Sequence, residues 1–343
     1  MTHASSGALR DPAPVERRTI EQRETALRRH PLLIGGTAVA ALAASAVINH
    51  LNARRAEAAT PPAGDFVEVD GVRLHYVDRG SGPAVVFLHG NGVTLQDYAA
   101  SGVLDLAARS HRVIAFDRPG FGYSERPRSK AWTPRAQASL LAAALHRIGV
   151  EQAVVVGHSW GTMPAIAMAL DHRRLVSGLV LLSGYYFGTG RPDVVPFSLP
   201  AIPGLGDVMA HTVSPLSGAL LGPAIIKASF SPAPVSSKFD AFPIGLALRP
   251  SQVRATAADT AMMVPAAMEL SRHFAEITVP VVVMAGEGDR IAFPSRHSER
   301  LAEAVAGAEL RVIPEQGHLF HYAVPEQVVA AIDDVAQRAR GAA

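Results

Sequence analysis

Short runs of aliphatic and β-branched residues alternate with stretches of helical periodicity along most of the chain from residue 65 onward. The runs predict strands at 66–69, 72–77, 84–88, 112–116, 154–156, 179–182, 279–285 and 310–313. The stretches between them predict helices near 95–109, 134–148, 163–170, 295–305 and 326–340. This alternation predicts an α/β fold, with a mostly parallel sheet flanked by helices on both faces. The first two strands lie on either side of Asp70-Gly71, a typical hairpin turn.

Residues 184–276 interrupt the alternation. They are rich in proline, alanine and methionine, and they contain short helical pieces and no clear strand pattern. Such a segment is too long to be a loop within a compact domain, and its low charge and many apolar residues argue against disorder. We therefore expect a helical lid, inserted between core strands and covering the strand ends.

The N-terminal part of the chain has a different pattern. Residues 1–31 are polar and rich in arginine, which predicts a disordered or loosely helical segment. Leu32–Ile48 contains no charged residue and would span about 25 Å as a helix, slightly less than a hydrocarbon core. We interpret residues 32–51 as a hydrophobic anchor or signal segment and residues 52–64 as a linker. The main domain then covers residues 65–343.

Three interpretations of the apolar segment remain open. Six arginines precede it and two follow closely, so as a single anchor it would leave the N-terminus in the cytoplasm and the main domain outside. Alternatively, Arg28-Arg29 before the run is similar to a twin-arginine signal, and Ala56-Glu57-Ala58 offers cleavage near Ala58. The third possibility is a helix packed on the domain. Its apolar residues cover all sides, which is unusual for a surface helix, and we favour the anchor.

Composition excludes several other classes of protein. The 343 residues are 48% hydrophobic, enough for a large core. The excess of positive charge lies within the first 60 residues, and no basic patch with interleaved aromatic residues indicates a nucleic-acid partner. Since the chain has no cysteine, it has no disulfide, no thiolate metal site and no thiol nucleophile. We expect no metal and no cofactor.

The segment around Ser159 carries the strongest chemical signal. Val154-Val155-Val156 leads into Gly157-His158-Ser159-Trp160-Gly161, and a helix-prone stretch follows. G-x-S-x-G between a strand and a helix is the pattern of a nucleophile elbow. The turn is so sharp that side chains at the two glycine positions would clash. The first amides of the next helix favour an anion at the same place. Ser159 is the predicted nucleophile.

A serine nucleophile needs a base, and the base needs an orienting acid. In elbow proteins these follow the serine in the order acid, then histidine. Asp289 comes directly after a strongly apolar strand, and His318 comes after the final predicted strand. We assign Asp289 as the acid and His318 as the base. Glu287 would point elsewhere on an extended turn, and His321 is expected to serve packing.

Two backbone amides would complete the site as an oxyanion hole. One belongs to Trp160, directly after the nucleophile, and the other to Asn91, in the loop after His89-Gly90. We expect His89 to brace this loop through a hydrogen bond and Asp117 to brace its own loop. We also expect His158 to point away from the serine.

These motifs together resemble a known family. The hairpin is followed in order by His-Gly-Asn-Gly, Asp-Arg-Pro-Gly-Phe-Gly, Gly-His-Ser-Trp-Gly, Gly-Glu-Gly-Asp and Gly-His. Residues 66–340 thus resemble a capped α/β-hydrolase of the esterase-like serine hydrolase type, which implies that fold and a Ser-His-Asp triad. The motif layout is also similar to that of epoxide hydrolases and haloalkane dehalogenases. Those enzymes carry aspartate at the position of Ser159, and dehalogenases hold the halide with an Asn and a Trp at the positions of Asn91 and Trp160.

The serine argues against both of those activities. A serine that opened an epoxide or displaced a halide would form an ether, which a histidine-activated water cannot hydrolyse. Epoxide opening in the resembled family also uses a pair of lid tyrosines, and residues 187–276 contain no tyrosine.

We therefore expect a hydrolase that cleaves a carboxylic ester of a small to medium apolar substrate through an acyl-enzyme. A carbon–carbon bond hydrolase and a cofactor-free haloperoxidase or perhydrolase would use the same triad, and both stay open. A non-catalytic binding protein of this fold is the alternative from another class, and the three filled triad positions count against it. The sequence specifies neither the substrate-binding residues nor the oligomeric state.

Overall fold

The computed structural model describes residues 14–342 of the chain. It divides into two units, residues 1–48 and residues 49–343. The described part of the first unit belongs to helix α1 (Pro14–Ala59), which continues into the second unit. Residues 1–13 of the expected Arg-rich segment lie outside the described residues, and residues 14–31 are helical.

The expected linker at residues 52–64 is shorter than the sequence suggested. Residues 52–59 form the last part of α1, and only residues 60–64 lack regular structure. Alanine, leucine and arginine, which dominate residues 51–59, have high helix propensity. The helix ends before Pro61-Pro62, which cannot continue it.

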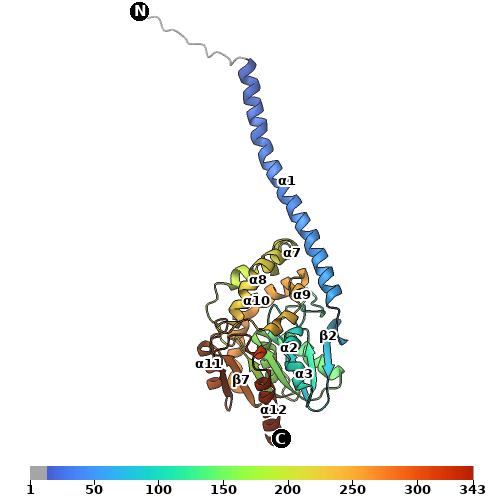
Figure 1. Ribbon diagram of the computed structural model, residues 1–343, viewed down its shortest axis with the longest axis vertical. Coiled ribbons are helices and arrows are strands. Elements are labelled where there is room, and N and C mark those ends of the chain that lie inside the picture. Colours follow the sequence, from blue (N-terminus) through green and yellow to red (C-terminus); the bar gives the residue numbers. More distant parts are fainter. Residues whose placement is uncertain (1–13, 343) are drawn as a thin grey trace, which may run out of the picture. The chain divides into compact units, whose positions relative to one another are not determined.

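An eight-stranded sheet forms the centre of the second unit, in the order β1-β2-β4-β3-β5-β6-β7-β8 (Figure 1). The strands are β1 (Asp65–Val69), β2 (Val72–Arg79), β3 (Ala84–Leu88), β4 (Arg112–Phe116), β5 (Ala153–His158), β6 (Val176–Leu182), β7 (Val281–Gly286) and β8 (Glu309–Ile313). β2 pairs antiparallel with β1 and β4, and all other pairs are parallel. The predicted α/β architecture is confirmed.

Helices cover both faces of this sheet. Val86 and Val155 point into a core shared with α4 (Pro134–Arg147), α5 (Thr162–Asp171) and α11 (Ser298–Ala304). The alternate positions, such as Val85 and Val154, point into a second core with α2 (Gln96–Ser101), α3 (Val103–Ala107) and α12 (Pro325–Ala342). Because successive strand residues face opposite sides, a continuous apolar run fills both cores. The helix predicted at 95–109 is two helices, interrupted at Gly102, whose φ is 88°.

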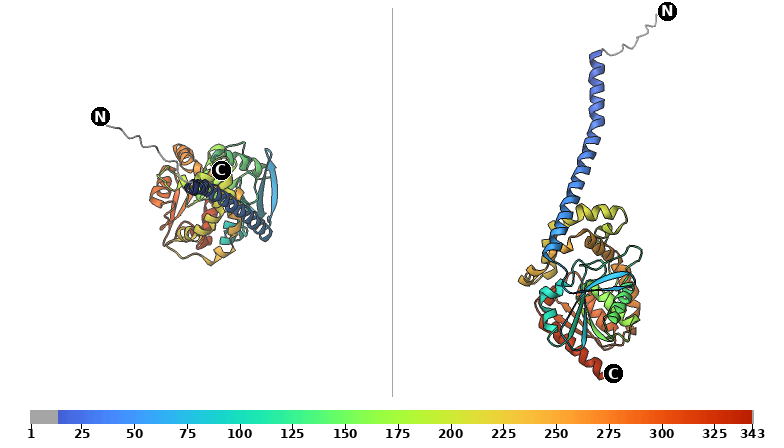
Figure 2. Two further views of the ribbon diagram at one scale, coloured as in Figure 1. Left: turned by 90° about the horizontal axis from the view of Figure 1, so that it is seen from above. Right: turned by 90° about the vertical axis from the view of Figure 1, so that its right-hand side faces the viewer.

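The segment between β6 and β7 is helical, as its composition predicted. It contains α6 (Val194–Ser198), α7 (Leu205–His211), α8 (Val213–Phe230), α9 (Ile244–Ala247), α10 (Pro250–Leu270) and three short 3₁₀ turns at Leu199–Ala201, Ser237–Ala241 and Ser271–Glu276. Figures 1 and 2 show these helices, in yellow to orange, gathered at one end of the sheet. We refer to residues 184–276 as the insertion.

Candidate active site

The backbone around Ser159 has the geometry expected of an elbow. Ser159 lies directly after β5 and has a φ of 51°, a left-handed conformation that is costly for a residue with a side chain. A Cβ at Gly161 would overlap the carbonyl oxygen of Leu88 on β3, and one at Gly157 would come within 2.6 Å of the carbonyl oxygen of Gly161. Gly161 is therefore required by the close approach of the turn to β3, and Gly157 by the close approach of β5 to the start of the following helix.

His318 and Asp289 are brought together by neighbouring strands. Asp289 follows β7 and His318 follows β8, and these strands are parallel neighbours. The Nδ1 of His318 donates to Oδ2 of Asp289 over 2.8 Å, and both residues are buried. The Oδ1 of Asp289 accepts the backbone N–H groups of Ile291 and Ala292 at 2.8 and 2.9 Å.

The carboxyl group of Asp289 is held ionised by these partners. Burial opposes ionisation, but His318 and the two backbone N–H groups outweigh it and keep the pKa of Asp289 below its ordinary value. The rival acid, Glu287, is exposed and accepts the backbone N–H of Glu315. Of the two acidic residues in this loop, only Asp289 contacts His318.

Four of the residues predicted from the sequence line one cavity of about 340 Å³. Asn91, Ser159, Trp160 and His318 all lie on its wall. Much of the remaining lining comes from the insertion and is mostly apolar, with Phe197, Ile225, Ile226, Phe239, Phe242 and Met263. Arg191 and Asp193 are charged residues of the lining, and they pair with each other at 2.6 Å.

The side chains of Asn91 and Trp160 are both bonded to α10 of the insertion. The Asn91 Nδ2 donates to the carbonyl of Thr256 and to Oγ1 of Thr260, over 3.1 and 2.9 Å. The Trp160 Nε1 donates to the carbonyl of Asp259 over 2.9 Å. Since these side-chain N–H groups are already engaged, the donors that the two positions can offer to the cavity are their backbone N–H groups.

A buried arginine that the sequence analysis missed fixes the loop that carries Asn91. Arg118 donates to the carbonyls of His89 and Gly90, at 2.8 and 3.0 Å, and pairs with Asp259 of α10 at 2.7 Å. Its guanidinium stacks on the ring of Trp160, 4.6 Å from the centroid. Arg118 thus connects the loop, the elbow and the insertion. The sequence offered one signal for this contact, since Asp259 is the single acidic residue in the apolar stretch 255–267.

His89 and Asp117 brace their loops as expected. The Nε2 of His89 accepts the backbone N–H of Arg118, so Nδ1 carries the proton and donates to the carbonyl of Gly90. Burial, together with the positive charge of Arg118, lowers the pKa of His89 to about 4, which keeps it neutral. Asp117 accepts the backbone N–H groups of Leu95 and Tyr123.

His158 and His321 form a buried polar cluster behind His318. The Nε2 of His158 bonds to the carbonyl of His318 over 3.1 Å, and His321 bonds to Asp97 over the same distance. Asp97 also accepts the hydroxyl of Tyr322. The ligand atoms of Asp97, His158 and His321 lie within 4.8 Å of one another, a spacing that a metal ion could use. The hydrogen bonds already satisfy Asp97 without a cation.

Comparison with known proteins finds relatives in sequence and in structure. An uncharacterised protein of Mycobacterium tuberculosis is 28% identical over 292 residues, which is 79% of this chain and 80% of that protein. A 2-hydroxymuconate semialdehyde hydrolase of Pseudomonas sp. is 35% identical over 124 residues, 36% of this chain and 44% of that enzyme. The solved structure of an N-acyl homoserine lactone degrading enzyme has a TM-score of 0.60 at 26% identity and covers 79% of this chain and 99% of its own.

The family match covers most of the second unit. The sequence matches the family described as alpha/beta hydrolase fold over residues 83–323, from β3 to the turn after His318. This range contains the elbow, the insertion and both partners of the His318–Asp289 hydrogen bond. The chain therefore belongs to the alpha/beta hydrolase fold family, and its activity is hydrolytic.

Proposed function

We propose that the chain is a serine hydrolase that cleaves a carboxylic ester of a small to medium apolar substrate through an acyl-enzyme. The observation that carries this proposal is the 2.8 Å hydrogen bond from His318 to Asp289, beside a cavity whose wall also contains Ser159. A nucleophile, a base and an orienting carboxylate are the three groups that acyl transfer by serine requires.

The proposed reaction has two halves. The Oγ of Ser159 attacks the ester carbonyl carbon while Nε2 of His318 accepts the hydroxyl proton, and Asp289 holds His318 in the tautomer that leaves Nε2 free. The backbone N–H groups of Asn91 and Trp160 stabilise the oxyanion. His318 then returns the proton to the departing alcohol. A water molecule, deprotonated by His318, releases the acid and restores Ser159.

The engaged side chains of Asn91 and Trp160 support ester chemistry over dehalogenation. A halide site would need their side-chain N–H groups to face the cavity, and here they donate to Thr256, Thr260 and Asp259. Redirecting these donors toward a halide would break the three hydrogen bonds that hold the two side chains on α10.

The cavity supports an apolar substrate of modest size. Its volume of about 340 Å³ lies at the small end of the range for small-molecule sites, and its charged pair, Arg191 with Asp193, is internally neutralised. The similarity to an N-acyl homoserine lactone degrading enzyme also supports hydrolysis at a carbonyl with an oxygen leaving group.

Carbon–carbon bond hydrolysis is the second candidate. The similarity to a 2-hydroxymuconate semialdehyde hydrolase favours it, and the same three residues would serve. A haloperoxidase or perhydrolase activity would also use this triad. Rates on matched ester and carbon–carbon substrates separate the candidates, and we expect kcat/KM to be higher for the esters.

We also propose that residues 32–51 anchor the chain in a membrane, with the catalytic unit outside the cytoplasm. Ile34–Ala59 is long and apolar enough to cross a bilayer by length and composition. Fractionation with N-terminal sequencing tests this. An intact N-terminus in the membrane fraction supports the anchor, and a mature N-terminus near Ala58 supports export after cleavage instead.

A series of aryl esters with graded acyl chains tests the hydrolase proposal. Ser159→Ala and His318→Ala should each lower kcat by about 10⁶-fold, and the double variant should be scarcely worse, because the triad acts as a unit. Losses that multiply independently in the double variant would show that the two residues do not belong to one triad.

A further inference from the structure

The outer side of the insertion exposes large apolar residues. Leu205 and Val208 of α7, together with Val213, Leu216, Leu220 and Leu221 of α8, are all exposed, and Leu220 has 81% of its surface in solvent. Only three of the 18 residues of α8 are buried. We call these six residues and Ile202 the apolar surface of the insertion. Large exposed apolar residues on two helices that pack together indicate an interaction site.

α8 has the composition of a membrane helix but belongs to the domain. By length and composition it could cross a bilayer, yet Gly218, Gly222 and Ile225 line the catalytic cavity. α8 therefore has one side toward the cavity and the other toward solvent. The side of α8 that faces solvent is therefore available to an apolar environment outside the domain.

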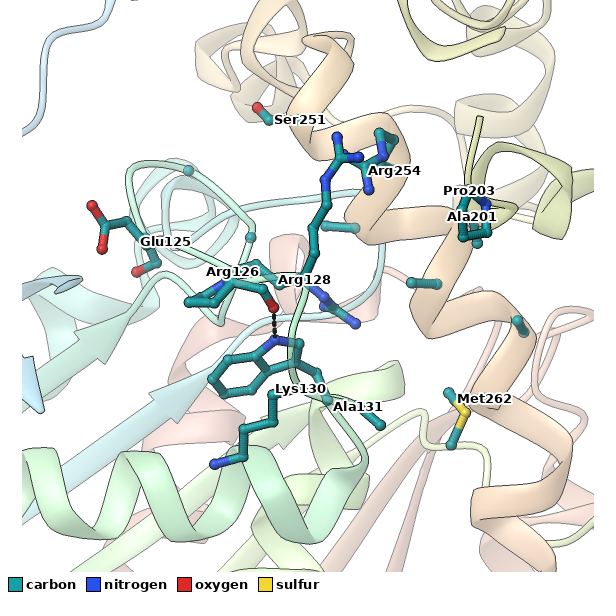
Figure 3. A pocket seen from close by; sticks show the side chains of 18 residues that line it. Glu125, Arg126, Arg128, Lys130, Ala131, Ala201, Pro203, Ser251, Arg254 and Met262 are labelled. Carbon is teal, nitrogen blue, oxygen red and sulfur yellow. Dashed lines mark hydrogen bonds between the residues drawn. The ribbon is translucent and has the colours of Figure 1, made fainter. Parts of the chain in front are cut away.

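A second cavity, of about 730 Å³, lies on the other side of α10 and shares no residue with the catalytic cavity. Figure 3 shows Arg126, Arg128, Lys130 and Arg254 around it, and Ser251 near the start of α10. The first turn of this helix is itself favourable for anions. We call this cavity the basic pocket.

Four cationic side chains line the basic pocket, against one lining carboxylate, Glu125 (Figure 3). Arg128 and Arg254 share one carboxylate, Asp207, at 2.8 and 3.1 Å. Arg126 shares Asp259 with the buried Arg118. Burial, followed by repulsion from Arg128, lowers the pKa of Arg254, which agrees with an excess of nearby cations. An anionic group would relieve this repulsion.

The apolar surface and the basic pocket meet at one turn. Ala201 and Pro203 line the pocket, while Ile202 between them and Leu205 just after them are exposed. Asp207, in the first turn of α7, pairs with Arg128. An apolar surface beside a cationic cavity matches the chemistry of a phospholipid layer, with acyl chains below and anionic headgroups above.

The last part of α1, which lies within the second unit, is bonded to the insertion. Asn49 donates to the carbonyls of His211 and Thr212, where α7 meets α8, over 2.9 and 2.7 Å. Glu57 pairs with Arg249 beside α9 at 3.1 Å. Residues 49–59, which pack on the insertion, directly follow the apolar run Leu32–Ile48 in sequence.

We propose that the apolar surface of the insertion docks in the interfacial layer of a lipid bilayer and that the basic pocket holds an anionic phospholipid headgroup. Apolar substrates then reach the catalytic cavity from the bilayer, past Gly218, Gly222 and Ile225. The docking rests on the anchor proposed above and not on the catalytic mechanism, so a binding experiment separates the two.

The full chain, which has no cysteine, allows a single fluorescent label. Leu220→Cys carrying an environment-sensitive fluorophore is reconstituted into nanodiscs of phosphatidylcholine and phosphatidylglycerol. Glu151→Cys, exposed just before the amino end of β5, is the matched control. We expect a blue shift at position 220 and quenching by nitroxide-labelled lipid, with neither at position 151. A label at position 220 that is as unquenched as the one at 151 would overturn the docking.

The headgroup site is tested with the same label at Leu205→Cys. Arg128→Gln removes one positive charge from the pocket and leaves the ion pair between Arg254 and Asp207 in place. Arg147→Gln, which removes an exposed positive charge of α4, is the control. Quenching should require about fivefold more phosphatidylglycerol in Arg128→Gln, since one surface charge contributes about 1 kcal/mol, and should be unchanged in Arg147→Gln. Equal dependence on phosphatidylglycerol in both variants, or replacement of its effect by inorganic phosphate, would overturn the headgroup site. Circular dichroism melts check that both variants are folded.

Discussion

The turns at the carboxyl ends of the strands and the outer side of the insertion are built in opposite ways. In the turns, buried polar groups are matched by specific partners: Arg118 reaches two carbonyls and Asp259, and Asp289 reaches His318 and two backbone N–H groups. On the outer side of α8, the large residues are apolar and exposed, with Leu220 as the extreme.

This difference indicates what each region requires of its residues. A turn whose groups must stay within hydrogen-bond distance tolerates little change, because each buried partner that is lost leaves another group unsatisfied. The outer side of α8 has no comparable contacts to lose, so its residues can be selected for what they meet outside the domain. The two regions should therefore respond differently to the same kind of substitution.

The largest expected effect is at the acid. Asp289→Asn should keep the fold and lower kcat by about 10⁴-fold, because the amide favours the wrong tautomer of His318. Glu287→Gln, two residues away and exposed, is the matched control and should change kcat by less than about threefold. Steady-state kinetics on one ester decide the matter. A severe loss in Glu287→Gln with a mild one in Asp289→Asn would mean that the acid is wrongly assigned.

The same glycine-to-alanine change should have opposite effects in the two regions. At Gly161 the new Cβ would overlap the backbone of Leu88, so Gly161→Ala should lower the free energy of unfolding by more than about 3 kcal/mol. At Gly222 of α8 no atom lies within 4 Å of the new Cβ. Gly222→Ala should be neutral or stabilise by about 1 kcal/mol through helix propensity. Urea unfolding measures the free energy of unfolding of both variants. Similar losses of stability at Gly161 and Gly222 would contradict the predicted difference between the two regions.

As the pH falls, the buried histidines should lower the free energy of unfolding before the carboxylates begin to bind protons. Burial first, and then the neighbouring His321 and His318, lowers the pKa of His158 to about 3. Burial first, and then Arg118, lowers the pKa of His89 to about 4. Both values lie below the ordinary value of about 6.5. The unfolded chain therefore binds these protons first. As the pH falls below 6.5, each histidine should lower the free energy of unfolding by about 1.4 kcal/mol per pH unit, until the folded pKa is reached.

Variants of the two histidines show whether they cause this slope. His158→Gln and His89→Gln should each flatten the dependence of unfolding free energy on pH between 6 and 5, and His146→Gln, an exposed residue of α4, should not. If all three variants keep the slope of the parent chain, these histidines are not its source. Carboxylates with lowered pKa values, such as Asp97 and Asp117, act only below about pH 4 and do not enter this window.

Sequence patterns were sufficient where the chain determines structure locally. The strands could be found because both faces are buried, which produces continuous apolar runs. Ser159 and His318 line one cavity, and Asp289 is bonded to His318, because the carboxyl ends of neighbouring parallel strands lie at the same edge of a sheet. The break at Gly102 was missed because the residues on either side of it, 95–101 and 103–109, share one helical pattern.

Long-range contacts and the surface of the insertion could not be predicted in this way. Arg118 and Asp259 are 141 residues apart, and no periodicity connects a loop after β4 with a helix of the insertion. α8 is apolar around its whole circumference, so its sequence does not indicate which side faces the cavity. The end of α1 was also missed, since helix propensity in residues 52–59 was outweighed in our interpretation by the prolines that follow.

Covalent labelling with a fluorophosphonate tests the central proposal most directly, because it needs no knowledge of the substrate. The full chain is treated with the probe, digested and mapped by mass spectrometry. We expect a single phosphonyl adduct on Ser159, formed much more slowly in His318→Ala and absent after heat denaturation. A folded chain that stays unlabelled at Ser159, or that reacts there equally fast with and without His318, would contradict the proposed serine hydrolase.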